Sequence, residues 1–175
     1  GDGVPRGVLT LVRERKGTGR PGSPGDPDHT TVPSCSYLLQ PMQPRFNLST
    51  ASPGVYKAMM ALEEHLHHCS IEVPLIHLVK LRASQINACA YCIDMHWKDL
   101  RALGQTEQRL YSLDAWRECP WYSDRERAAL AWTEAVTLVA DGQVPDSVHE
   151  AVRPHFNDTE LADLTCAIAT ITAWN

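Results

Sequence analysis

The sequence predicts an all-α protein of one domain. Apolar residues recur at helical spacing from about residue 42 to the end of the chain, and no segment alternates convincingly with period two. Capping residues and prolines precede these stretches, and glycines follow several of them. At 175 residues the chain is long enough for one substantial core and too short to favour two domains. We therefore expect a bundle of six to seven helices.

The first 41 residues differ from the rest in composition. They hold seven of the ten glycines and six of the twelve prolines, with little apolar periodicity. Such a segment cannot bury enough apolar surface to offset the entropy lost on ordering its backbone. We expect residues 1–41 to be a disordered or extension segment and place the domain at 42–175.

The first three helices are expected between residues 50 and 104. The first begins at Thr50 or Ser52 and the second at Pro74, because proline is tolerated in a first helical turn. Asn87 is expected to cap a third helix that Gly104 ends. The apolar stripe of the first helix is expected at Val55, Met59, Leu62 and Leu66, and that of the second at Leu75, Leu78, Val79 and Ile86.

Four further helices complete the expected bundle. A fourth covers residues 106–116. Ser123 and Glu126 form a capping box for a fifth helix, which ends at residues 141–142. Pro145 leads a short sixth helix. Asn157 and Glu160 form a capping box for a seventh helix, which is still apolar at 173–175, without a stop signal, and is compatible with a chain cut inside it.

The chemistry is expected at Cys89, Cys92 and His96. Their spacing of i, i+3 and i+7, at ~100° per residue, places all three within about 60° on one helix face. A helix N-terminus favours a thiolate, and His96 can accept a proton from Cys92. Two neighbouring thiols can reduce a peroxide or a disulfide and close into a disulfide of their own. This cycle needs no bound cofactor, but it needs an external dithiol reductant.

Two other interpretations of the cysteines stay open. In the first interpretation the cysteines are thiols packed in the core, and His96 is a surface or core histidine. In the second they bind zinc with His96, and the cluster at residues 65–69 (His65, His67, His68 and Cys69) supplies a fourth ligand. Our preferred assignment contains no metal. Haem attachment is not favoured, because the histidine does not directly follow the second cysteine.

Charge and hydropathy exclude several classes of partner. The net charge of −5 gives no electrostatic case for nucleic acid or an anionic membrane. No apolar stretch approaches the ~20 residues of a transmembrane helix, and no signal peptide opens the chain, so we expect a cytoplasmic protein. We interpret Lys80 as part of a solvated helix face. Asp94 and Asp99 are also expected on the surface, although either could orient His96.

Two stretches of the sequence resemble a known family. The run LVKLRASQINACAYCIDMHWKDLRALGQTEQRL, followed by AWRECPWYSDRERAALAWTEAVTL, closely resembles the alkylhydroperoxidase D-like proteins of the carboxymuconolactone decarboxylase superfamily. The resemblance covers residues 42–175. It implies an all-helical fold, assembly into dimers, trimers or hexamers, and an antioxidant peroxidase or disulfide reductase acting on hydrogen peroxide or organic hydroperoxides. It also implies Cys89 and Cys92 as the redox pair, His96 as a relay residue, and a lipoylated protein as reductant.

One position departs from the family's pattern. Twelve residues before the first cysteine, where the family's relay has a glutamate, this chain has His77. A neutral histidine can still accept a proton but supplies no negative charge. We assign His77 to the site, with a bystander role equally open, and favour Cys92 as the attacking sulfur and Cys89 as the resolving one. Two alternatives remain: a catalytically weak helical binding oligomer, or a decarboxylase of a lactone acid.

Overall fold

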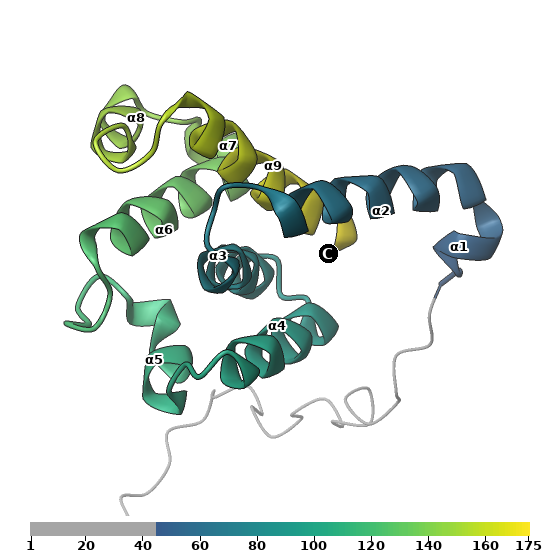
Figure 1. Cartoon of the computed structure of the whole chain (residues 1–175), viewed down its shortest axis with the longest axis horizontal. Coiled ribbons are helices and arrows are strands. Elements are labelled where there is room, and N and C mark those ends of the chain that lie inside the picture. Colours follow the sequence, from purple (N-terminus) through teal and green to yellow (C-terminus); the bar gives the residue numbers. More distant parts are fainter. Residues whose placement is uncertain (1–44) are drawn as a thin grey trace, which may run out of the picture. The chain divides into compact units, whose positions relative to one another are not determined.

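The computed structural model describes residues 45–175, which form nine α-helices, one short 3₁₀ helix and no strand (Figure 1). The all-α prediction is confirmed. The predicted disordered or extension segment, residues 1–41, lies outside the described residues. The helices are α1 (Leu48–Ala51), α2 (Pro53–His68), α3 (Val73–Ile86), α4 (Ala90–Ala102), α5 (Glu107–Tyr111), α6 (Asp124–Thr137), α7 (Val139–Gly142), α8 (Asp146–Val152) and α9 (Asp158–Trp174), with the 3₁₀ helix η2 at Leu113–Ala115.

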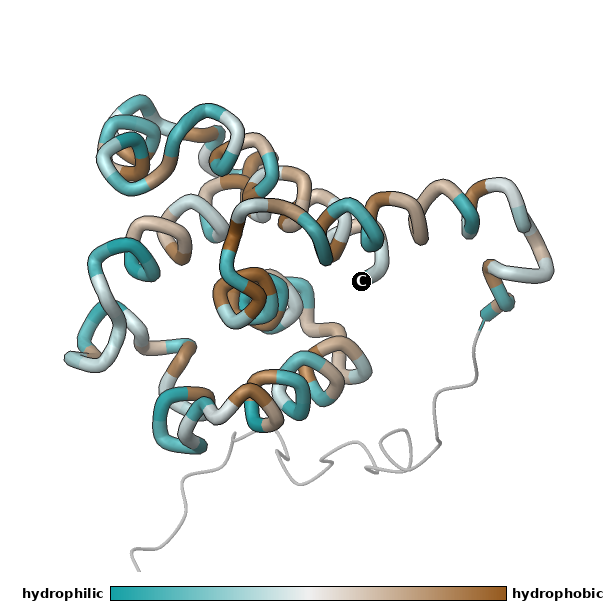
Figure 2. Tube along the Cα trace, in the orientation of Figure 1, coloured by the Kyte–Doolittle hydropathy of each residue, from teal (hydrophilic) through white to brown (hydrophobic). Residues whose placement is uncertain are grey.

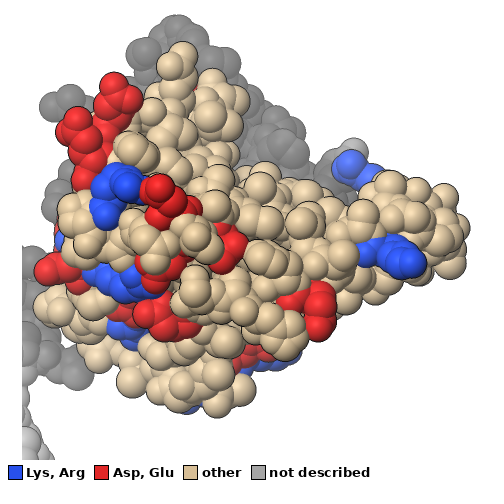
Figure 3. Space-filling model, turned by 45° about the horizontal axis from the view of Figure 1, so that its top comes forward, with Lys and Arg blue, Asp and Glu red and all other residues tan. Residues whose placement is uncertain are grey.

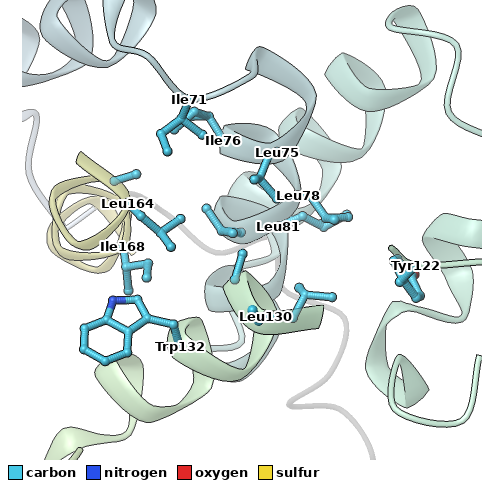
Figure 4. Close-up of a cluster of buried hydrophobic side chains, with 14 of the residues drawn as sticks. Ile71, Leu75, Ile76, Leu78, Leu81, Tyr122, Leu130, Trp132, Leu164 and Ile168 are labelled. Atoms are coloured by element: carbon cyan, nitrogen blue, oxygen red, sulfur yellow. The ribbon is translucent and has the colours of Figure 1, made fainter. Parts of the chain in front are cut away.

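Helix α3 is the centre of the bundle. It packs against α4, α6 and α9, and it is buried on almost every side (Figures 1 and 2). A helix that is enclosed in this way must be apolar around most of its circumference. Figure 4 shows side chains of α3 meeting those of α6 and α9. The central contacts come from Leu75, Leu78 and Leu81 of α3, Leu130 and Trp132 of α6, and Leu164 and Ile168 of α9.

Both predicted capping boxes are present. The Ser123 hydroxyl accepts from the backbone N–H of Glu126, and the Glu126 carboxylate accepts from the backbone N–H of Ser123, which starts α6. Asn157 and Glu160 make the same reciprocal pair at the start of α9. Each box satisfies backbone donors that a helix N-terminus leaves unpaired. Local sequence was sufficient to locate these two starts.

The predicted cap of the cysteine-bearing helix was wrong. Asn87 ends α3, where its backbone N–H bonds to the carbonyl of Ala83, and Cys89 is the N-cap of α4. Ala88 turns the chain with a φ of 54°. The helical bonds of α3 thus extend to Asn87, and α4 begins at Ala90, two residues later than an Asn87 cap would imply. Gly104, with a φ of 83°, follows the end of α4 as predicted, since a glycine adopts this conformation without steric cost.

Two predicted helices are interrupted. The helix expected over 106–116 divides at Ser112 into α5 and η2, where the Ser112 hydroxyl donates to the carbonyl of Gln108. The helix expected to continue to residues 141–142 is interrupted at Leu138, between α6 and α7. Serine side chains that bond the preceding turn compete with continued helix formation.

Helix α2 does not bury the stripe that was predicted for it. Only Leu66 lies in the core, whereas Val55 is 51% exposed and Leu62 is 40% exposed. The second half of α2 packs on α9, and its first half projects beyond the bundle, with Tyr56 contacting Trp174 at the end of α9 (Figure 1). Among residues 45–175, most of the projecting half is left uncovered by other helices. The helical period was correct, but most of this apolar stripe lies outside the core.

The charged surface of the described residues mixes both signs. On the face shown in Figure 3, acidic and basic side chains lie beside one another over most of the bundle. No helix within residues 45–175 has both the length and the apolar composition needed to cross a membrane.

Glu134 of α6 joins two other segments. Its carboxylate accepts from Trp116 Nε1 at 2.8 Å, from Arg117 Nη1 at 2.5 Å and from Arg82 Nε of α3 at 2.9 Å. Burial by itself would raise the pKa of Glu134, but the hydrogen bonds from these three donors outweigh it and hold the pKa below its ordinary value. Glu134 is therefore expected to stabilise the fold as an anion.

Replacing Glu134 with Gln should lower the free energy of unfolding by ~1–3 kcal/mol at pH 7, because Arg117 loses its anionic partner and Arg82 keeps only Asp114. The difference in free energy of unfolding between the wild type and the variant should be largest above the ordinary carboxyl pKa. It should decrease as the pH falls through the lowered pKa of Glu134. Urea denaturation at pH 7 and pH 3.5 measures both effects. Glu118→Gln removes the same charge from an exposed side chain and is the control. Equal losses in the two variants would contradict this role for Glu134.

Candidate active site

The two cysteines meet at the start of α4. Cys89 is the N-cap and Cys92 lies three residues later in the first turn, with the two Sγ atoms 2.6 Å apart. Cys92 is buried against Ala83 and Ile171, whereas Cys89 is only half-buried. A disulfide bond is ~2.05 Å long, so this pair can close with little movement of either side chain. The predicted dithiol is therefore assembled by the fold.

The protonation state of Cys92 differs from the sequence-based expectation. Burial, followed by the hydrogen bond with Cys89, raises the pKa of Cys92 to about 11. The N-terminal turn of α4 stabilises a thiolate, but here it does not compensate for the loss of water. The expectation that the helix N-terminus favours a thiolate was wrong for Cys92. At neutral pH its sulfur is held as a thiol.

His96 lies one helical turn beyond Cys92 and faces His77. It is buried in α4, and its Nδ1 is 3.2 Å from Nδ1 of His77 in α3. Burial and the neighbouring His77 lower the pKa of His96 to about 4, so the ring is neutral at pH 7. Its Nε2 is buried and has no hydrogen-bond partner among residues 45–175. With pKa values of about 11 and about 4, Cys92 and His96 do not form a resting thiolate–imidazolium pair.

His77 and Asp99 complete this polar cluster. Asp99 Oδ2 lies 3.4 Å from Nδ1 of His77 and 3.6 Å from Nδ1 of His96. Burial lowers the pKa of His77, although the carboxylate of Asp99 acts in the opposite direction. His77 thus contacts His96 directly, as an active role for His77 would require. Of the two surface aspartates that sequence reasoning considered, Asp99 is the one that reaches the histidines.

A cavity of about 600 Å³ opens beside these residues. Helices α2, α3, α4 and α9 line it, and Cys92, His96, His77 and Asp99 are on its wall. Cys89 is not among the lining residues. A small substrate that enters the cavity would therefore meet Cys92 before Cys89.

Sequence reasoning missed a buried ion pair in the same wall. Lys80 of α3 is 4% exposed, and its Nζ lies 2.5 Å from the carboxylate of Glu63 in α2. Trp174 of α9 donates its indole N–H to the same carboxylate at 3.0 Å. The interpretation of Lys80 as part of a solvated face was wrong. Its spacing of three residues from His77 places both on one face of α3, which was the available signal.

The structure does not assemble the zinc site considered from sequence. His65 bonds Asp163 at 2.7 Å, His68 bonds Glu64 at 3.0 Å, and the Cys69 thiol donates to a backbone carbonyl. Within residues 45–175, neither Cys89 nor Cys92 belongs to a group of three side chains that converge as metal ligands.

The raised pKa predicts how the reactivity of Cys92 depends on pH. Below a pKa of about 11 the thiolate fraction rises about tenfold per pH unit, so alkylation of Cys92 by iodoacetamide should accelerate steadily from pH 7 to pH 10. Peptide mass spectrometry of the reduced protein measures the rate at this residue. Glutathione, treated in parallel, should approach its plateau earlier. A plateau for Cys92 below pH 8 would contradict the buried-thiol assignment.

Comparisons with known proteins agree with this architecture. A model of the carboxymuconolactone decarboxylase family matches residues 53–135. The uncharacterized protein YdfG of Bacillus subtilis is 42% identical over 134 residues, which are 77% of this chain and 91% of the relative. The uncharacterized protein YnjA of Escherichia coli is 31% identical over 91 residues, which are 52% of this chain and 50% of that protein.

Solved structures show the same fold. The crystal structure of ATU0492 from Agrobacterium tumefaciens, described as a putative antioxidant defence protein AhpD, has a TM-score of 0.72 and 45% identity. The likeness covers 75% of this chain and 90% of that one. A peroxidase-related protein of Silicibacter has a TM-score of 0.60 at 22% identity, over 67% and 63% of the two chains, and supports the fold alone. The chain belongs to the carboxymuconolactone decarboxylase family, as an alkylhydroperoxidase D-like member.

Proposed function

We propose that the chain is a thiol-dependent peroxidase or disulfide reductase that cycles Cys89 and Cys92 between dithiol and disulfide. The observation that carries the proposal is the contact of the two sulfurs, 2.6 Å apart, at the wall of a substrate-sized cavity. The description of ATU0492 as a putative antioxidant defence protein agrees with this chemistry. An antioxidant role is the physiological setting that we propose.

In the first step the Cys92 sulfur attacks the terminal oxygen of hydrogen peroxide or an organic hydroperoxide. An S–O bond forms, the O–O bond breaks, and the leaving oxygen takes up a proton to give water or an alcohol. Cys92 becomes a sulfenic acid. Cys92 is the attacking sulfur in this scheme because it lines the cavity and Cys89 does not.

In the second step Cys89 resolves this intermediate. Its sulfur displaces the hydroxyl group of the sulfenic acid, and a disulfide and water result. An external dithiol then attacks the disulfide, leaves as a disulfide itself, and returns both cysteines to thiols. Half-buried Cys89 is the more accessible sulfur for this exchange. A lipoylated protein is the reductant that we propose.

His96 is proposed to receive the proton that Cys92 loses. When the ring proton is on Nδ1, beside His77 and Asp99, the unpaired Nε2 carries the accepting lone pair. Because Cys92 is not ionised at rest, the proton must move as the peroxide reacts. His77 takes the place of an anionic relay residue and orients the His96 ring.

Cys92→Ser and Cys89→Ser should each abolish peroxide turnover supported by dihydrolipoamide, to below about 1% of the wild-type rate, because the cycle needs both sulfurs. Cumene hydroperoxide and hydrogen peroxide serve as substrates, and loss of peroxide is the readout. Cys166→Ser changes a half-buried thiol of α9 and should keep the rate within twofold. Undiminished turnover in both active-site variants would refute the proposal and favour a binding or decarboxylase role.

We also propose that the chain associates with copies of itself through the projecting half of α2. Val55, Tyr56 and Met60 of this half, and Leu62 just beyond it, expose apolar surface, and Tyr56 and Met60 also line the cavity. A second copy seated on this face would cover apolar surface that one chain leaves in water. It would also narrow the entrance to the site.

Light scattering coupled to size-exclusion chromatography tests the association. The wild type should elute as a multiple of the 19.5 kDa chain, and the double variant Val55→Glu/Leu62→Glu should shift to a single chain. Leu138→Glu introduces a charge at an apolar residue exposed to a similar degree outside α2 and should leave the mass unchanged. A wild type that elutes as one chain at micromolar concentration would refute the association.

A further inference from the structure

Three ligand-type atoms converge in the cavity wall beside the dithiol. They are Nδ1 of His77, Nδ1 of His96 and Oδ2 of Asp99, with separations of 3.2, 3.4 and 3.6 Å. Among residues 45–175 this is the group of histidine, cysteine and acidic side chains that could converge on one ion. The proposed thiol cycle uses His96 as a proton acceptor and His77 to orient its ring, but it does not require all three atoms to converge on one point.

The separations match the edges of a metal coordination polyhedron. Zinc binds imidazole nitrogen and carboxylate oxygen at ~2.0–2.2 Å. Three ligands at ~2.1 Å around a tetrahedral centre lie ~3.4 Å apart, and around an octahedral centre they lie ~3.0 Å apart. The observed separations of 3.2, 3.4 and 3.6 Å centre on the tetrahedral value.

We propose that His77, His96 and Asp99 form a binding site for one divalent transition-metal ion, with Zn²⁺ the best match, and leave its fourth position open to the cavity. Two histidines and one carboxylate are a ligand set that such ions accept. All three residues line the cavity, so a water molecule or a small anion can reach the fourth position. The site goes beyond the thiol cycle, because neither sulfur is a ligand.

The surroundings suit a cation. Ligation requires neutral imidazoles, and burial disfavours the charged form of both rings. The positive charge of Lys80 is compensated by Glu63, and Asp99 supplies one negative charge to the ion. The hairpin of α3 and α4 holds the ligands before any ion arrives, since His96 and Asp99 are one turn apart and His77 faces them.

Metal binding and proton transfer would compete for the same ring. An ion on Nδ1 of His96 leaves the ring proton on Nε2, so that nitrogen becomes a donor and can no longer accept a proton from Cys92. A bound ion should therefore slow the proposed peroxidase cycle. His77 is central to this inference, because it supplies one of the two nitrogen ligands.

Isothermal titration of the full, reduced, chelator-treated chain with ZnCl₂ tests the site. We expect one ion per chain, and at least ~100-fold weaker binding in His77→Gln and in Asp99→Asn, beyond what loss of an outer-shell partner usually costs. His67→Gln, at a cavity residue outside the triad, and Cys89→Ser/Cys92→Ser should bind within threefold of the wild type. The cysteine variant separates this proposal from the thiol cycle, which it abolishes.

Cobalt substitution gives a readout that does not depend on how well a variant folds. Wild-type protein loaded with Co²⁺ should show intense visible bands of a four-coordinate site, without the near-ultraviolet charge-transfer band of a thiolate ligand. The absence of stoichiometric binding to the wild type would overturn the proposal. Binding that survives His77→Gln but is lost in Cys89→Ser/Cys92→Ser would overturn it as well, in favour of a thiolate site.

Discussion

The enclosure of α3 by its neighbours is the constraint on which the rest of the structure depends. Leu78, Val79 and Leu81 are almost fully buried, so α3 can neither slide nor rotate without opening the core. Its orientation determines where His77 and Lys80 emerge into the cavity. Helix α3 ends at Ile86, with Asn87 as its C-cap, and this end determines where the chain turns and α4 begins. The sulfurs, the histidines and the ion pair are therefore placed by the packing of one helix.

The same enclosure sets the chemistry of the site, because it removes water. Burial raises the pKa of the Cys92 thiol and lowers the pKa of both histidines, so it favours the neutral form of each group. The neighbouring charge pair of Lys80 with Glu63 also receives a hydrogen bond from Trp174. In the proposed cycle the buried Cys92 thiol reacts slowly until its proton is removed, which makes the state of His96 decisive. Proton transfer and metal ligation are the two uses that we propose for that one ring.

The projecting half of α2 connects assembly to the site. Tyr56 and Met60 belong both to the exposed apolar face and to the cavity wall. A partner chain on that face would change access to Cys92 without touching the sulfur. The physical basis is apolar area left in water by a single chain, which favours association whenever a complementary surface is available.

Much of this molecule was predictable from sequence because the relevant signals are local. The capping boxes at Ser123 and Asn157, the glycine that follows α4, and the spacing of Cys89, Cys92 and His96 each depend on residues within about two helical turns. Only the tertiary structure decided the environment of each functional side chain. The properties of this environment depend on which helices lie against each other, and thus on how much water each group loses. They include the pKa of Cys92, the burial of Lys80, the exposure of Val55 and the contact of His77 with Asp99. Periodicity identifies the face of a helix, but only packing determines what that face meets.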